Sequence, residues 1–135
     1  MPHDQKAWTI SQLAAEFGIS TRTIRFYEEK NLIAPDRTSG GHRIYRKRDR
    51  ARLKLILRGK RFGHSLEEIA EMIGLAPEEK GEREQIERTL AYGDRNLKEI
   101  RLKIKELRLL ERDILEIRDR LLDKLRELDQ TATAD

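Results

Sequence analysis

The sequence predicts a mainly α-helical chain: a winged helix-turn-helix domain at residues 1–76, then a linker and a coiled-coil dimerisation helix at residues 77–131. Three observations predict it. The first domain contains short amphipathic helical patterns separated by glycine turns. A hairpin pattern, with glycines between β-prone segments, interrupts those helices. Residues 85–128 repeat apolar positions mostly at spacings of three and four, which is typical of a helix that packs against a partner helix.

The first helix follows a short extended entry at residues 8–10, where Trp8 should pack the N-terminus onto the domain. Ser11 can cap this helix, because a serine hydroxyl accepts a hydrogen bond from an unpaired backbone N–H of the first turn. The inner face of the helix should carry three apolar side chains, Leu13, Ala14 and Phe17.

A tight turn leads into the second helix. Gly18 can end the first helix in the left-handed conformation, and Ser20 can cap the second. On the second helix Ile24 should face the first, whereas residues 21–23 project from its exposed N-terminal turn. The helix should end near residues 30–31. This arrangement is a helix-turn-helix, in which the start of the second helix reaches base edges.

A two-stranded wing is predicted next. Residues 32–34 and 43–45 form two short β-prone segments around Pro35 and a glycine turn at residues 39–41. A recognition helix followed by a hairpin rich in arginine and tyrosine can grip DNA in two places.

Two further helices complete the predicted first domain. Asp49 should cap a third helix with an apolar face made by Leu53, Ile56 and Leu57. Gly63 should break the chain, and Ser65 with Glu68 has the spacing of a capping box that opens a fourth helix. The inner stripe of that helix consists of Leu66, Ile69, Ala70 and Ile73. Gly74 followed by Leu75 suits its C-terminal cap.

The long helix should begin after a linker at residues 76–81, in which Pro77 is a strong helix breaker. A helix over residues 85–128 is roughly 65 Å long at 1.5 Å per residue. Its apolar stripe consists of Ile86, Leu90, Leu97, Ile100, Ile104, Leu107, Leu110, Ile114, Ile117, Leu121, Leu125 and Leu128. An isolated helix would expose this stripe to water, so we expect a partner helix. Residues 131–135 should be a frayed tail.

The charge is distributed unevenly along the chain. The net charge is +4, but residues 1–75 contain 15 Lys and Arg against 9 Asp and Glu, and residues 76–135 contain 14 against 16. Residues 37–61 contain 11 basic residues and one acid, Asp49. A positive patch within a helix-turn-helix pattern points to a phosphate backbone as its partner.

Several classes of protein are disfavoured by composition. The chain contains no cysteine, which excludes disulfides, thiolate metal sites and cysteine nucleophiles. No segment approaches transmembrane length and the N-terminus has no apolar signal core, so we expect a cytoplasmic protein without a membrane partner. No catalytic arrangement appears, so we expect no enzyme activity and no cofactor. His64 with Glu67 and Glu68 could ligate a metal, but carboxylates at a helix start more often cap it, and we expect no metal site.

These motifs together strongly resemble the DNA-binding half of the MerR family of bacterial transcription regulators. The matches occur in order: Thr23-Ile24-Arg25 with Tyr27-Glu28, Leu32-Ile33 with Pro35, Gly41 to Arg43 with Tyr45, Asp49 with Arg52-Leu53, and Ser65-Leu66 with Glu68-Ile69. Asn31 stands where many members have glycine, but asparagine tolerates the left-handed conformation. Phe26 stands where a second tyrosine is common, which removes a hydroxyl.

The resemblance implies a homodimer whose long helices form an antiparallel coiled coil. Each winged domain would bind half of a palindromic operator in promoter DNA, where RNA polymerase is a further partner. Many members activate by bending and untwisting the DNA, and others repress.

The resemblance also implies a set of DNA-binding residues. On the second helix, Thr21, Arg22 and Thr23 would contact bases or the adjoining backbone. Arg25 and Tyr27 would bind phosphates, because a guanidinium forms a fork and a phenol donates one hydrogen bond. The remaining predicted contacts are Arg37, His42, Arg43 and Tyr45 of the wing, and Arg61 before the fourth helix. The alternative for both tyrosines is packing in the core.

The resemblance leaves the signal open. Absence of cysteine excludes thiolate sensing of mercury, copper, zinc or lead. Residues 48–61 resemble the branch that regulates branched-chain amino-acid and acyl-CoA catabolism, so an acyl-CoA thioester is one candidate effector. Lys80, Arg83 and Arg88, near the linker and fourth helix, could receive such an anion. Alternatively, these charges are ordinary surface groups and the protein binds DNA constitutively.

Two other functions share some of these features. An architectural DNA-binding protein without effector control would have the basic patch but little sequence preference. A coiled-coil interaction scaffold would need the long helix but not the basic wing.

Overall fold

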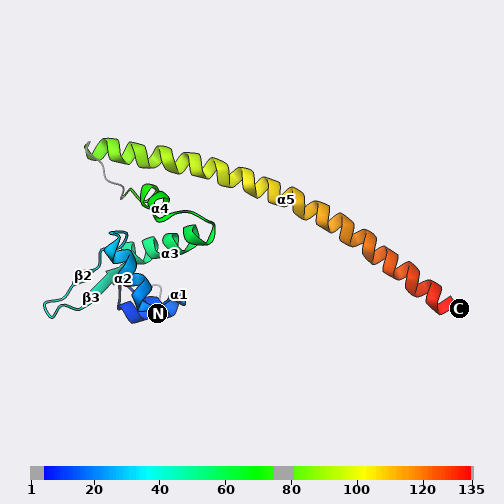
Figure 1. The fold of residues 1–135 in the computed structure, drawn as a ribbon, viewed down its shortest axis with the longest axis horizontal. Helices are drawn as coiled ribbons and strands as arrows, with labels where there is room; N and C mark the ends of the chain where they lie inside the picture. The colour runs from blue at the N-terminus through cyan, green and yellow to red at the C-terminus, as the bar shows by residue number, and fades with distance from the viewer. Residues whose placement is uncertain (1–4, 75–80, 135) are drawn as a thin grey trace. The chain divides into compact units, whose positions relative to one another are not determined.

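The computed structural model describes residues 5–74 and 81–134. The chain forms two compact units, one extending to Tyr92 and the other beginning at Gly93 (Figure 1). The elements in chain order are β1 (Ala7–Trp8), α1 (Ile10–Phe17), α2 (Thr21–Glu29), β2 (Asp36–Arg37), β3 (Arg43–Arg46), α3 (Lys47–Arg61), α4 (Leu66–Met72) and α5 (Glu82–Ala134). The mainly helical architecture with a small wing sheet is the predicted one.

The first helix is capped by Thr9 rather than by Ser11, so that prediction was wrong. The Thr9 hydroxyl accepts a hydrogen bond from the backbone N–H of Gln12, and the Gln12 side chain accepts one from the Thr9 N–H. This reciprocal capping box satisfies two orphan donors at once, whereas Ser11 already lies inside α1. The predicted inner face is confirmed, since Leu13 and Ala14 are buried and Phe17 packs against the core.

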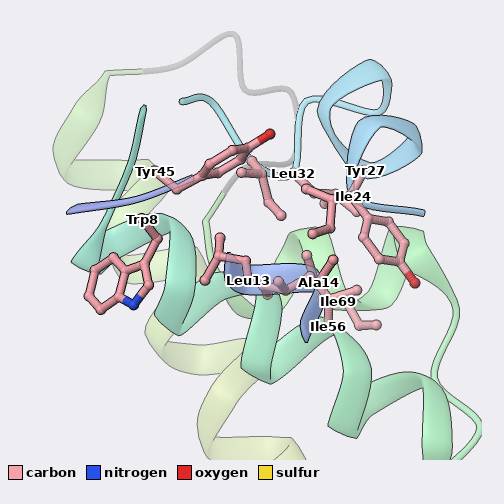
Figure 2. Close-up of a cluster of buried hydrophobic side chains, with 11 residues drawn as sticks. Trp8, Leu13, Ala14, Ile24, Tyr27, Leu32, Tyr45, Ile56 and Ile69 are labelled. Carbon is pink, nitrogen blue, oxygen red and sulfur yellow. The ribbon is translucent and has the colours of Figure 1, made fainter. Parts of the chain in front are cut away.

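The turn between α1 and α2 is the predicted one. Gly18 ends α1 with a φ of 65°, and the Ser20 hydroxyl accepts from the backbone N–H of Thr23 at the start of α2. Ile24 is fully buried in the core (Figure 2). Asn31, which follows the C-cap of α2, has a φ of 62°, so asparagine does serve in the left-handed position.

The wing sheet differs from the prediction in one strand. The first wing strand is β2 after Pro35, and residues 32–34 are not a strand. Leu32 and Ile33 are both 2% exposed, so successive side chains do not alternate between core and solvent as in a half-buried strand. The sheet order is β1-β3-β2, with both pairings antiparallel. Trp8, opposite Tyr45, ties the N-terminus to β3 as predicted.

Asp49 stabilises the start of α3 from inside the helix rather than from the N-cap position, which is Arg46. Its carboxylate accepts from the backbone N–H groups of Arg46 at 2.8 Å and Ala34 at 3.3 Å. The second bond explains why residues 32–34 form no strand, because Ala34 donates to this side chain instead. Asp49 is 1% exposed, and all its polar contacts are internal.

Helices α3 and α4 close the core of the first unit. A Cβ at buried Gly59 of α3 would lie 3.0 Å from the Ile69 side chain, so the glycine allows the two helices to approach closely. The predicted capping box of Ser65 and Glu68 is present. Gly74 has a φ of 75°, as expected after α4, whereas Leu75 and Pro77 lie outside the described residues. The core combines side chains from α1 to α4 and the sheet (Figure 2).

The long helix α5 has 53 residues and is longer than predicted at both ends. The prediction of a frayed tail was wrong over residues 131–134, which are helical. No glycine or proline interrupts this end, and the hydroxyls of Thr131 and Thr133 donate to the carbonyls of Glu127 and Asp129 within the helix. The twelve apolar side chains of the predicted stripe are each 42–63% exposed in the single chain.

Candidate DNA-binding surface

The exposed face of α2 carries a groove of about 500 Å³. Its lining consists of Arg22, Thr23, Arg25, Phe26 and Glu29. Residues three and four apart share one face of a helix, and Ile24 and Tyr27 occupy the opposite, buried face. The amphipathic pattern of α2 therefore presents two arginines and a ring that is 42% exposed on the side away from the core.

The two threonines at the start of α2 are held by local hydrogen bonds. The Thr23 and Ser20 hydroxyls lie 2.9 Å apart, and Arg25 Nη2 donates to Thr21 Oγ1 at 3.3 Å. Arg22 is exposed and lies beside them in the groove. Thr21, Arg22, Thr23 and Arg25 thus lie close together at the start of α2.

The wing is a short hairpin that projects beyond the helices (Figure 1). Arg37 Nη1 donates to the Gly41 carbonyl at 3.0 Å, and Gly41 has a φ of 82°. The backbone N–H of His42 donates to Thr38 Oγ1. Arg37 and His42 are both exposed near the hairpin turn, where their side chains are accessible to a ligand.

A carboxylate on α2 binds two residues of β3. Glu28 accepts hydrogen bonds from Arg43 Nε at 3.0 and 2.9 Å and from the Tyr45 hydroxyl at 2.8 Å. Tyr45 is fully buried. Burial raises the pKa of its phenol well above the ordinary value, and the hydrogen bond to Glu28 and its negative charge act in the same direction.

Core packing is therefore the interpretation that the structure favours for Tyr45. A phenol can donate one hydrogen bond, and here Glu28 accepts it. Tyr27 is 7% exposed, and burial raises its pKa. Figure 2 shows both rings within the buried cluster, with the Tyr27 hydroxyl pointing outward at its edge. Tyr27 thus combines core packing with a hydroxyl directed away from the cluster.

Alkaline pH should destabilise the domain through Tyr45. Because the pKa is raised in the folded chain, the unfolded chain loses this proton first, at its ordinary value of about 10. The stabilisation is complete below that pH and is lost as the pH rises further. Urea titrations between about pH 9 and 11 should show a smaller fall in unfolding free energy for Tyr45→Phe than for the wild type. Equal falls in the two proteins would contradict this assignment.

Arg61 is the last residue of α3 and is exposed. Phe26, Glu28 and Glu29 were not among the predicted site residues. The signal for Phe26 was available, because it lies four residues after Arg22 on the same helical face.

The candidate effector and metal residues are engaged within the chain. Arg88 forms an ion pair with Glu71 of α4, and Arg83 with Glu87, while Lys80 lies outside the described residues. His64 Nδ1 is 3.8 Å from Glu68, whose pKa is lowered by hydrogen bonds from Ser65. Across residues 5–74 and 81–134, no three metal-binding side chains gather into a site.

These features define a winged helix-turn-helix protein with a basic recognition surface, and sequence comparison identifies its family. The model of the MerR HTH family regulatory protein matches residues 8–76, and the model described as MerR, DNA binding matches residues 50–117. The chain belongs to the MerR family, and it is a DNA-binding transcription regulator of the MerR type.

Relatives and solved structures agree with this assignment. The HTH-type transcriptional regulator ZntR homolog of Haemophilus influenzae is 36% identical over 112 residues, covering 82% of this chain and 81% of the relative. The mercuric resistance operon regulatory protein of Shigella flexneri is 31% identical over 118 residues, which cover 87% of this chain and 78% of the relative. HiNmlR, a MerR family regulator lacking the sensor domain and bound to promoter DNA, has a TM-score of 0.55 at 28% identity and covers 76% of each chain. These relatives are transcription regulators and not enzymes. No helix in the described part of this chain could span a membrane.

Proposed function

We propose that this chain binds a palindromic operator as a homodimer, with one winged domain on each half-site and α5 paired in an antiparallel coiled coil. The observation that supports the dimer is the apolar stripe of α5, which is exposed along its length in a single chain. Exposing so many apolar side chains to water is unfavourable, and pairing with a second α5 removes them. Operator DNA lies in the bacterial cytoplasm, so we infer that location.

The proposed contacts divide into two kinds. Arg22, Thr21 and Thr23 read or adjoin bases, because they stand at the exposed start of the recognition helix. The other residues bind backbone, and they are Arg25, Tyr27, Arg37, His42, Arg43 and Arg61. Tyr45 acts from the core by supporting β3.

Two alanine variants distinguish these roles. Arg22→Ala should cost roughly 1–3 kcal/mol on operator DNA and little on random DNA, because it removes base readout. Arg43→Ala should weaken binding to both DNAs and reduce the salt slope by about one phosphate contact. The measurement is fluorescence anisotropy on both duplexes over a salt series. Arg126→Ala, an exposed arginine on α5, is the matched control and should leave both affinities unchanged. If Arg22→Ala weakened binding to both DNAs and Arg43→Ala weakened only operator binding, the proposed base and backbone roles would be reversed.

Regulation is proposed to act through DNA shape. A dimer that contacts two separated half-sites can bend and untwist the DNA between them, so specificity depends partly on how easily that DNA deforms. RNA polymerase at the same promoter is then the partner that responds to the altered spacing.

An acyl-CoA thioester remains the proposed effector class, and constitutive binding is the competing proposal. The ion pair of Arg88 favours the second, because an anionic ligand would have to compete with Glu71. The Arg83–Glu87 pair is mostly exposed and offers little competition. Operator affinity measured with and without thioesters separates them. Divalent metal ions are the control, since the chain offers them no thiolate.

A further inference from the structure

Glu28 is an acidic residue within the DNA-binding surface, where its charge alone opposes binding. It lies in the last turn of α2, its side chain is 13% exposed, and it contacts Arg43, a proposed phosphate ligand. A carboxylate beside a phosphate repels it and partly neutralises the arginine. Its presence is therefore explained only by a contribution that outweighs this cost.

The geometry suggests that contribution. Both oxygens of Glu28 accept from Nε of Arg43, and Oε1 also accepts from the Tyr45 hydroxyl. These bonds fix the Arg43 side chain at Nε, its inner nitrogen. Among the described residues, its terminal Nη1 and Nη2 groups make no hydrogen bond, so their donors remain available. A guanidinium held in this way loses less entropy on binding a phosphate.

The Glu28 carboxylate connects the recognition helix α2 to strand β3 of the wing. Glu28 belongs to α2, whereas Arg43 and Tyr45 belong to β3, 15 and 17 residues further along the chain. Tyr45 is fully buried and Arg43 is 27% exposed, so the contact lies at the boundary of core and surface. Shielding from water strengthens charge-assisted hydrogen bonds of this kind.

We propose that Glu28 is a positioning residue that orients Arg43 of the wing toward a DNA phosphate and sets the wing against the recognition helix. This inference rests on the proposed function, in which Arg43 binds backbone. The inference assigns Glu28 a favourable effect on DNA affinity, opposite in sign to the effect of its charge.

The test is a double-mutant cycle on operator binding, using the full chain. Glu28→Gln removes one negative charge, so electrostatics alone predicts tighter binding. We expect weaker binding instead, by roughly fivefold to tenfold, about the net effect of one hydrogen bond. In the Arg43→Ala background the same change should alter affinity less than about twofold. Glu67→Gln, with the same charge change at an exposed position of α4, is the control and should not weaken binding.

A methylphosphonate scan of the operator provides a readout that a purely structural role would not change. Neutralising one phosphate in each half-site should weaken the wild type, and both Arg43→Ala and Glu28→Gln should be insensitive at that position. Tyr45→Phe keeps the Glu28–Arg43 pair and should retain the sensitivity. If Glu28→Gln proves unfolded, Glu28→Asp, which keeps the charge but shortens the reach, replaces it in both measurements.

Tighter binding by Glu28→Gln, or an equal loss with and without Arg43, would overturn the positioning role while leaving the Arg43 contact intact. An Arg43→Ala variant that binds like the wild type would remove Arg43 from the proposed interface, and the inference with it.

Discussion

Replacing Ile104 and Leu107 together with lysine should convert the protein to monomers and weaken operator binding by roughly 10²–10⁴-fold, the advantage that linking two binding modules provides. Both side chains belong to the apolar stripe of α5 and are 42% and 63% exposed in the single chain. Each lysine placed in the coiled-coil seam would have to lose its hydration. An apolar interface offers no polar partner that would offset this cost in free energy. Sedimentation velocity measures the oligomeric state, and anisotropy measures the operator affinity.

Glu106→Lys is a matched control for that double variant. It changes the net charge by the same amount, on the same turn of α5, but lies outside the stripe. We expect it to remain dimeric and to bind the operator. A double variant that still sediments as a dimer would contradict the coiled-coil assignment, even if its DNA affinity fell.

Replacing Asp49 with alanine should destabilise the winged domain by about 3 kcal/mol, because it leaves two backbone donors without their partner. The carboxylate is 1% exposed and accepts from Ala34 before β2 and from Arg46 at the start of α3. Its loss therefore weakens both the helix start and the segment that leads into the wing. Urea unfolding followed by circular dichroism gives the free energy.

Asp36→Ala is the matched control for Asp49. Asp36 forms an ion pair with Arg46, but both side chains are more than half exposed, at 64% and 51%. Exposed ion pairs contribute less than about 1 kcal/mol, so this variant should be nearly as stable as the wild type. Similar losses of unfolding free energy in the two variants would mean that the buried hydrogen bonds of Asp49 stabilise the domain no more than an exposed ion pair does.

The sequence predicted the features that local chemistry decides. Gly18, Ser20 and the Ser65–Glu68 capping box depend on residues at most four positions apart, and all are confirmed. The N-cap of α1 was misplaced by two residues because Thr9 and Ser11 both carry hydroxyls. The deciding signal was Gln12, three residues after Thr9, which completes a capping box.

The features that the sequence did not reveal depend on contacts between residues distant in sequence. The segment at 32–34 is β-prone, but Asp49, fifteen residues beyond Ala34, takes the backbone donor that a strand would use. Tyr45 has basic neighbours in sequence, which suggested a phosphate contact, but its hydroxyl donates a hydrogen bond to Glu28, seventeen residues away. Neither hydrogen bond follows from the spacing of neighbouring residues in the sequence, so only the folded chain could reveal the two bonds.

In the proposed function, a dimer of this chain reads an inverted repeat. Repeated selection from a pool of random DNA duplexes, followed by sequencing, tests it without knowledge of the regulated gene. The proposal predicts one recovered motif made of two half-sites related by two-fold symmetry, with a fixed spacing. Recovery of an asymmetric motif, or of no motif despite tight binding, would contradict it and would favour an architectural DNA-binding protein.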